Sequence, residues 1–128
     1  MDTTQQSRAS GRRVLVVDDD PTIRLLLSKF LEMQNCEAAT AAGGAEALEL
    51  LNAGHFDVIM VDLQMPGMTG IEFTEVVRQQ HPDIPIALIT GVAHTLGEDD
   101  LERVGISQLF TKPFDLDDIA TWIQSLPS

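Results

Sequence analysis

Short apolar runs alternate along the chain with longer segments in which apolar residues recur every three or four positions. The short runs are rich in β-branched residues, which is typical of strands that a parallel sheet buries on both faces. The longer segments have the spacing of amphipathic helices. The expected strands cover 14–17, 36–41, 58–61, 85–90 and 108–111. The expected helices begin at Pro21 and at Gly43 and then cover 71–80, 96–104 and 115–126.

The order of these elements predicts the fold class. Strands and helices alternate five times, which indicates an α/β fold: a five-stranded, doubly wound parallel sheet with right-handed crossovers and helices on both faces. A sheet order of 2-1-3-4-5, the flavodoxin-like order, makes the first and third strands neighbours. A chain of 128 residues has room for one such core. We expect it to occupy 12–128, after a disordered, polar N-terminal arm at 1–11.

The fourth helix is the weakest of the predicted elements. Gly97 lies inside it, and three acidic residues follow directly at 98–100. Glycine and clustered like charges both lower helix propensity. We therefore expect 96–104 to be the most mobile element.

Polar residues stand at the carboxyl ends of four of the expected strands. The third run ends on Asp62, and Pro66 and Gly67 then force a turn that keeps this carboxylate at the rim of the sheet. The carboxyl ends of parallel strands meet at one edge, where ligands bind in open α/β sheets. The other strand-end residues are Asp18, Asp19 and Asp20 after the first strand, Thr90 after the fourth and Lys112 after the fifth.

These residue types predict phosphoryl chemistry. Two carboxylates about 5 Å apart repel by roughly 3 kcal/mol at an effective dielectric constant of 20, so a cluster of Asp18, Asp19 and Asp62 requires a cation. Mg²⁺ fits because it takes carboxylate oxygens, keeps waters and bridges to phosphate. Lys112 supplies a second positive charge from the opposite side. Two cations and the Thr90 hydroxyl around a carboxylate form a site for transferring a phosphoryl group onto Asp62.

The same residues resemble those of a response-regulator receiver domain of two-component signalling, of the chemotaxis-receiver type. The resemblance covers about 12–126 and lies in VVDDDP at 16–21, DLQMPGMTG at 62–70, TG at 90–91 and KPF at 112–114. It implies that Asp62 is phosphorylated by a sensor histidine kinase or a histidine-phosphotransfer protein, and that a downstream output domain or protein reads the change. It also implies that Asp18 and Asp19 hold Mg²⁺ together with Asp62 and the backbone carbonyl of Gln64.

The chain departs from the family at one switch position. The resemblance implies that Thr90 and Lys112 hold the phosphoryl oxygens and that the peptide bond before Pro113 is cis. Family members commonly carry Tyr or Phe three residues before the lysine, where the ring turns inward as the threonine moves. Here the residue is Leu109, which has no ring, and Phe110 points to the opposite face of the strand. We therefore expect the response to be carried by the segment after Thr90 and by the 96–104 helix.

An enzyme of another class is the alternative. Asp18, Asp20 and Thr22 also have the spacing Asp-x-Asp-x-Thr of haloacid-dehalogenase-like phosphatases, with Asp18 as nucleophile. That family needs a further acidic pair at a strand end, whereas Asp117 and Asp118 fall inside the last helix. For the receiver class we expect catalysis of its own phosphotransfer and slow dephosphorylation, and no turnover of a separate substrate. A nucleotide- or flavin-binding domain lacks support because no glycine-rich phosphate turn follows the first strand.

Several chemically capable residues have a structural explanation. Asp20, next to Pro21, is expected to cap the first helix. Asp57 lies five residues before Asp62 and therefore at the opposite edge of the sheet. The histidines have no metal-binding spacing and are expected at the surface: His55, His81 and His94.

Composition narrows the partners and the compartment. The net charge of −12, from 20 acidic and 8 basic residues, opposes direct binding to nucleic acid or to an anionic membrane. No apolar run approaches the roughly 18 residues of a transmembrane helix, and the N-terminus lacks the apolar region of a signal peptide, so a cytoplasmic location is expected. The single cysteine, Cys36, cannot form an internal disulfide and is expected to be a buried, inert thiol.

Overall fold

The structure is a computed structural model, and it describes residues 11–91 and 98–127. Its strands are β1 (Arg13–Val17), β2 (Glu37–Ala41), β3 (Val58–Asp62), β4 (Ile86–Thr90) and β5 (Gln108–Thr111). Its helices are α1 (Pro21–Met33), α2 (Gly44–Ala53), α3 (Gly70–Gln80), α4 (Glu98–Val104) and α5 (Leu116–Ser125).

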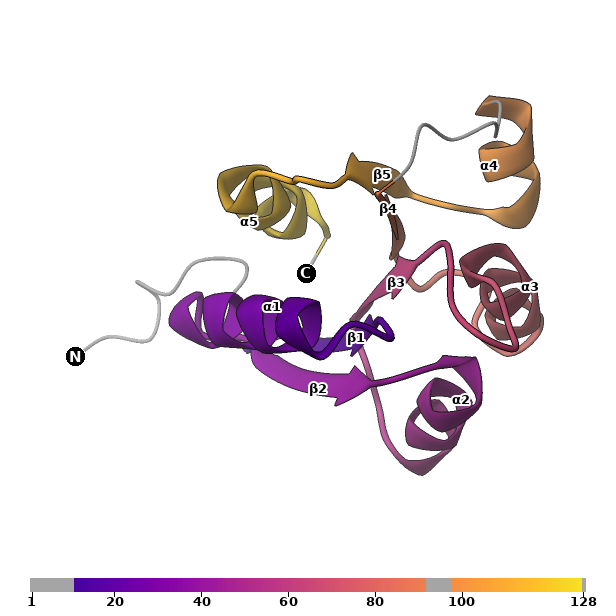
Figure 1. The fold of residues 1–128 in the computed structure, drawn as a ribbon, viewed down its shortest axis with the longest axis horizontal. Helices are drawn as coiled ribbons and strands as arrows, with labels where there is room; N and C mark the ends of the chain where they lie inside the picture. The colour runs from indigo at the N-terminus through magenta and orange to yellow at the C-terminus, as the bar shows by residue number, and fades with distance from the viewer. Residues whose placement is uncertain (1–10, 92–97, 128) are drawn as a thin grey trace.

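All five strands are parallel and form one sheet in the order β2-β1-β3-β4-β5. Helices α1 and α5 cover one face of the sheet, and α2, α3 and α4 cover the other (Figure 1). This is the predicted doubly wound arrangement, and β1 and β3 are neighbours as expected. Helix α1 follows β1 on one face and α3 follows β3 on the other (Figure 1), so the loops after these two neighbouring strands diverge around a crevice at their carboxyl ends.

The sheet separates two apolar clusters because alternate strand residues point to opposite faces. The cluster under α1 and α5 includes Val14, Val16, Leu27, Leu31, Met60, Ile89, Phe110, Ile119 and Ile123. The cluster under α2, α3 and α4 includes Leu15, Val17, Ala47, Leu51, Ile59, Val61, Phe73, Val77 and Leu88. Full burial of each large aliphatic side chain contributes about 1.5–3 kcal/mol relative to exposure. The strands that carry the site are therefore held rigidly from both sides.

Side-chain caps fix where the helices begin. The Asp20 carboxylate accepts a hydrogen bond from the backbone N–H of Thr22 at the start of α1, as predicted. Thr69 and Glu72 form a reciprocal capping box at the start of α3, and Asp115 caps α5. Each such cap is worth about 1 kcal/mol. The caps of α1 and α3 also order the two loops that border the site.

Some expectations concern residues whose placement is not described. The arm at 1–11 lies outside the described residues except for Gly11, whose N–H donates to the carbonyl of Asn35 at 2.7 Å. The fourth helix is described from Glu98 rather than from 96, and its expected mobility stays a prediction. Within the described ranges, none of the helices combines the length and apolar character that crossing a bilayer requires.

Candidate functional site

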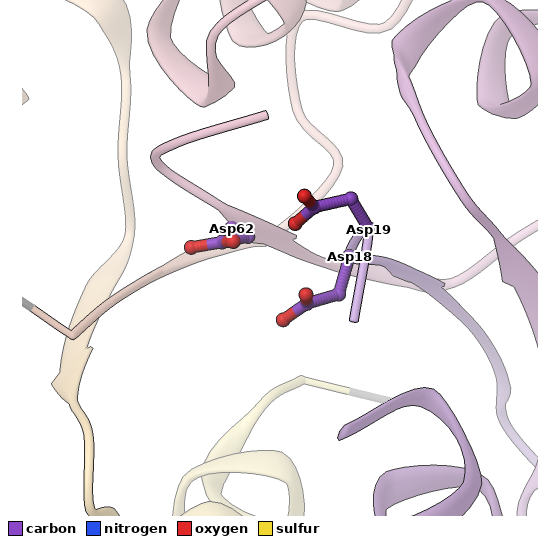
Figure 2. A group of neighbouring side chains, drawn as sticks. All are labelled: Asp18, Asp19 and Asp62. Carbon is purple, nitrogen blue, oxygen red and sulfur yellow. The ribbon is translucent and has the colours of Figure 1, made fainter. Parts of the chain in front are cut away.

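Three carboxylates meet at the carboxyl edge of the sheet. Asp18 and Asp19 follow β1, and Asp62 is the last residue of β3. One oxygen from each lies within 4.8 Å of the others, and Figure 2 shows the three side chains gathered at the ends of these two strands. Because β1 and β3 are paired, the predicted convergence of strand-end acids is what the structure contains.

The Asp62 carboxylate is in an unfavourable environment for its charge. The residue is only 6% exposed. Burial raises the pKa of Asp62 and the charge of Asp18 raises it further, while Lys112 and the backbone N–H of Gln64 oppose this rise without cancelling it. A raised pKa means that folding disfavours the ionised form. A cation at the site would relieve this cost.

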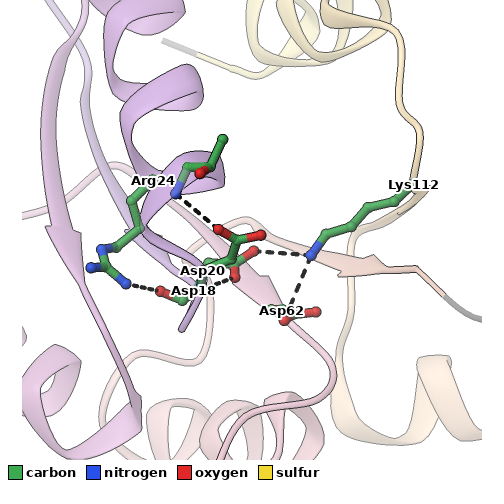
Figure 3. Close-up of polar contacts among 6 residues, drawn as sticks. Asp18, Asp20, Arg24, Asp62 and Lys112 are labelled. Carbon is green, nitrogen blue, oxygen red and sulfur yellow. Dashed lines mark hydrogen bonds and ion pairs between the residues drawn. The ribbon is translucent and has the colours of Figure 1, made fainter.

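Lys112 supplies one positive charge. Its Nζ lies 3.3 Å from Oδ2 of Asp18 and 3.7 Å from Oδ2 of Asp62, and Figure 3 shows the side chain reaching between them from the end of β5. Its backbone N–H donates to the carbonyl of Thr90 at 2.7 Å, which fixes the start of this segment against β4. The peptide bond from Lys112 to Pro113 is cis.

Thr90 occupies the corresponding position on β4. It is the last residue of that strand and is 1% exposed. In the sheet it pairs with Thr111, the residue before Lys112. Asp62, at the end of β3, pairs with Ile89, the residue before Thr90 on β4. Thr90 and Lys112 are thus brought to the same sheet edge as Asp62.

The segment after β3 closes one side of the site. Gly67 has a φ of +84°, a left-handed conformation that glycine adopts without strain. Gly70, the first residue of α3, packs so closely that a Cβ there would lie 2.5 Å from the backbone oxygen of Asp62. An open cleft of about 760 Å³ remains above the site, lined by Asp19, Asp20, Asp62, Gln64, Met65, Pro66, Thr69, Gly91 and Lys112.

The donor set fits Mg²⁺. The three grouped ligand atoms are all carboxylate oxygens, which hard divalent cations prefer. Asp18 is fully buried, Asp62 is nearly so and Asp19 is exposed toward solvent. This mixture provides fixed oxygens on the protein side and an open side for water or a phosphate oxygen. Among the described residues this is the one group of three acidic, histidine or cysteine side chains close enough to share an ion.

Arg24 also contacts the site, although no motif in the sequence pointed to it. This α1 residue donates from Nη1 to the backbone carbonyl of Asp18 at 2.7 Å (Figure 3). The only sequence signal was its spacing, one helical turn beyond the Asp20 cap, which points a long side chain back toward the preceding loop.

Other chemically capable residues lie away from this edge. Asp57 accepts from the backbone N–H of Arg13 at 2.8 Å and pairs with His55 at 2.8 Å, so it has the structural role expected of it. Cys36 is buried and its pKa is raised, chiefly by burial, as expected for an inert thiol. His94 lies outside the described residues.

Leu109 and Phe110 face opposite sides of β5. Leu109 packs with the cluster under α2, α3 and α4. Phe110 packs with the other cluster, where its ring meets that of Trp122 edge-on at a centroid distance of 6.0 Å. No aromatic ring of β5 therefore lies on the Leu109 side of the strand.

Comparisons with a family model and with curated proteins both match this chain to response regulators. A family model described as the response regulator receiver domain matches residues 14–124. Among curated proteins, the chain is 34% identical over 112 residues to the regulatory protein AtoC of Escherichia coli, covering 88% of this chain and 24% of that protein. It is 32% identical over 111 residues to the transcriptional regulator NtrC of the same species, covering 87% and 24%. The chain thus spans about a quarter of the length of these relatives.

Solved structures share the fold closely. The chemotaxis protein CheY4 of Vibrio cholerae superposes with a TM-score of 0.85 at 34% identity, covering 92% of this chain and all of that one. The response regulator TrrA of Thermotoga maritima, solved in complex with Mg²⁺ and beryllofluoride, superposes with a TM-score of 0.81 at 34% identity, covering 91% and 99%. These comparisons do not support the phosphatase alternative. The geometry disfavours it as well, because Asp18 is fully buried and both of its carboxylate oxygens already have partners. Its Oδ1 accepts from the backbone N–H of Asp20, and its Oδ2 accepts from Nζ of Lys112.

Proposed function

Because this chain belongs to the response regulator receiver domain family of two-component systems, we propose that Asp62 accepts a phosphoryl group from a phosphohistidine donor. The observation that carries the proposal is the position of this carboxylate. Asp62 ends a central strand, shares a cluster with two other acids, and has Lys112 Nζ at 3.7 Å. It also borders an open cleft that a donor can enter.

Each residue has a proposed task in the transfer. Asp18, Asp19, Asp62 and the backbone carbonyl of Gln64 would hold Mg²⁺, which when bound neutralises charge on phosphoryl oxygens. One oxygen of Asp62 forms a bond to phosphorus while the bond from phosphorus to the donor imidazole nitrogen breaks. The electron pair of that bond stays on the nitrogen, which is then protonated from solvent.

The remaining residues hold the product. The ammonium group of Lys112 and the hydroxyl of Thr90 would contact phosphoryl oxygens on the side away from the metal ligands. Asp62 becomes an acyl phosphate, which is labile, so the same site also supports slow dephosphorylation. We propose no turnover of a separate substrate.

The partners follow from the family and from the chemistry. The phosphoryl donor would be a sensor histidine kinase or a histidine-phosphotransfer protein, and the reader a downstream output domain or protein. The chain's net charge of −12 disfavours direct contact with nucleic acid or an anionic membrane. We propose a cytoplasmic location and a receiver domain over 12–128 preceded by an arm at 1–11.

Mass mapping tests the acceptor. With Mg²⁺ and acetyl phosphate, we expect a single phosphoryl adduct on the peptide that contains Asp62, and none on Asp62→Asn or after chelation of Mg²⁺. An adduct on Asp18, with rapid turnover of a generic phosphate ester, would instead select the phosphatase class. Asp57→Asn is the matched control because it removes the same charge at the opposite edge, and it should be labelled like the wild type.

A further inference from the structure

We propose that Arg24 is a positioning residue for the site, because it holds the loop between β1 and α1 in the geometry that turns Asp18 and Asp19 toward Asp62. The inference rests on the proposed function, since it concerns how well the same acids hold Mg²⁺. It assigns a role to a side chain that contacts neither a phosphoryl group nor the proposed ligand oxygens.

The contact itself is short and buried at its acceptor end. Nη1 of Arg24 donates to the backbone oxygen of Asp18 at 2.7 Å, and Asp18 is 0% exposed. A carbonyl with no access to water depends on partners inside the protein. A hydrogen bond from a charged donor is stronger than one between neutral groups.

The polar atoms of Asp18 each contact a different segment of the protein. Its N–H donates to the carbonyl of Ala41 at the end of β2, at 3.1 Å. Its Oδ1 accepts from the N–H of Asp20 at 2.9 Å, and its Oδ2 lies 3.3 Å from Nζ of Lys112. Arg24 is the contact from α1, as Figure 3 shows. Loss of Arg24 would release the loop on the helix side and leave the Asp18 carbonyl without this donor.

The planar peptide bond carries this restraint to Asp19. The carbonyl of Asp18 lies in the same plane as the nitrogen and Cα of Asp19. Fixing that carbonyl therefore restrains the nitrogen and Cα of Asp19, the atoms from which its side chain leaves the loop. Asp19 is exposed, so packing does not hold it in place. The Arg24 contact thus narrows the range of distances between the Asp19 and Asp62 carboxylates.

Charge and positioning predict effects of opposite sign. Arg24 is a cation near a site for another cation, so its charge alone opposes Mg²⁺ binding. If only the charge mattered, a neutral residue at this position would strengthen Mg²⁺ binding. If Arg24 acts by positioning, the same substitution weakens it.

Mg²⁺ titrations followed by amide chemical shifts at constant ionic strength give the dissociation constant directly, apart from any change in stability. We expect Arg24→Gln to weaken Mg²⁺ binding on the order of tenfold, the usual effect of losing a residue that orients a ligand. Lys29→Gln is the matched control because Lys29 is exposed on the same helix and carries the same charge. It should stay within about twofold of the wild type, since solvent screens exposed charges. Arg24→Lys should have a Mg²⁺ dissociation constant between those of Arg24→Gln and Lys29→Gln.

The outcomes separate this inference from the proposed function. A wild-type protein without a saturable Mg²⁺ response would overturn the metal site and this inference together. Wild-type binding with Arg24→Gln as tight as Lys29→Gln, or tighter, would overturn the positioning role alone. If the amide spectrum shows that Arg24→Gln does not fold, Arg24→Lys decides: weakened binding supports positioning, and wild-type binding contradicts it.

Discussion

At the scale of single residues, Asp62 is a carboxylate whose ionised form is disfavoured by folding. Burial and the neighbouring charge of Asp18 both raise its pKa, and Lys112 at 3.7 Å compensates only in part. Above this raised pKa the ionised carboxylate lowers the free energy of unfolding. The site therefore retains an electrostatic cost that either a cation or a neutral side chain would remove.

Replacing Asp62 by Asn should stabilise the protein in the absence of divalent cations. The amide keeps the shape of the side chain and removes one of three clustered charges, so we expect the free energy of unfolding at neutral pH to rise on the order of 1 kcal/mol. Urea unfolding in the presence of a chelator measures it. A clear loss of stability in Asp62→Asn would contradict the view that repulsion dominates at this position.

Asp57 should show the opposite behaviour, and its contribution should depend on pH. Burial raises the pKa of Asp57, but the N–H of Arg13 and the contact with His55 outweigh burial and leave the pKa lowered. A lowered pKa stabilises the folded state above the unfolded value of 3.8, and this contribution is lost as the pH falls through the folded value. Asp57→Asn should therefore melt below the wild type at pH 6, and this gap in melting temperature should narrow as the pH falls below 3.8. A gap that is constant across this range would rule out the assigned cause.

The positions of residues at strand ends were predictable from the sequence. Asp18, Asp62 and Lys112 were predictable because the carboxyl ends of parallel strands share one edge. Arg24 was not, because its contact is with a backbone carbonyl and depends on how α1 is oriented over the loop. A periodic pattern gives which face of a helix is apolar, but not which loop atom a polar side chain reaches.

At the scale of elements, the site depends on how closely α3 packs against β3. Helix α3 begins at Gly70, where a Cβ would lie 2.5 Å from the backbone oxygen of Asp62 and 2.9 Å from Cδ1 of Leu88. The first of these is a backbone atom of the proposed acceptor, so it cannot move without disturbing the site. Only glycine permits this approach.

Gly70→Ala should therefore destabilise the protein, although alanine is the better helix former. We expect a loss of about 1–3 kcal/mol, the usual cost of forcing an extra carbon into a packed region. Gly43→Ala is the matched control because it lies next to the start of α2 and a Cβ there meets nothing within 4 Å. Thermal or urea unfolding of both variants measures the difference. Equal stabilities for Gly70→Ala and Gly43→Ala would show that α3 can shift at no cost.

The response to phosphorylation should be distributed unevenly among the elements. Leu109 has no ring and cannot make the movement that the family's aromatic residue makes. Phe110 packs on the opposite face of β5, against Trp122. We expect beryllofluoride to shift amide resonances most strongly, away from the site itself, in the segment after Thr90 and along α4. Distal changes centred on residue 109 while 91–104 stay still would contradict this, as would loss of the response in a folded Leu109→Ala variant.

Element boundaries show where local rules are sufficient. Asp20 beside Pro21 was a predictable cap because one side chain and one turn decide it. The start of β2 was less predictable, because Cys36 donates its N–H to the carbonyl of Leu31 and so completes the end of α1 before the strand begins at Glu37. That contact belongs to the packing of α1 and not to the apolar pattern of the strand.

At the scale of the whole molecule, the proposed site residues and the contacts that only support the fold lie at opposite edges of the sheet. The acids, Thr90 and Lys112 gather at the carboxyl edge. At the opposite edge Arg12 donates to the carbonyls of Leu126 and Pro127 at 2.7 and 3.1 Å, joining β1 to the end of α5. The fold was predictable because five alternations of strand and helix leave few right-handed parallel arrangements. The placement of helices on each face was not specified by the apolar pattern, since every helix has one apolar side.

The central claim is that one carboxylate, Asp62, receives the phosphoryl group within this set of acids and cations. The most direct measurement is the ¹⁹F NMR spectrum of beryllofluoride added to the protein, because a bound phosphoryl mimic gives resonances distinct from those of the free ion. We expect bound resonances in the wild type and in Asp57→Asn when Mg²⁺ is present, and none in Asp62→Asn or after chelation. Bound resonances that persist unchanged in a folded Asp62→Asn variant would contradict the account.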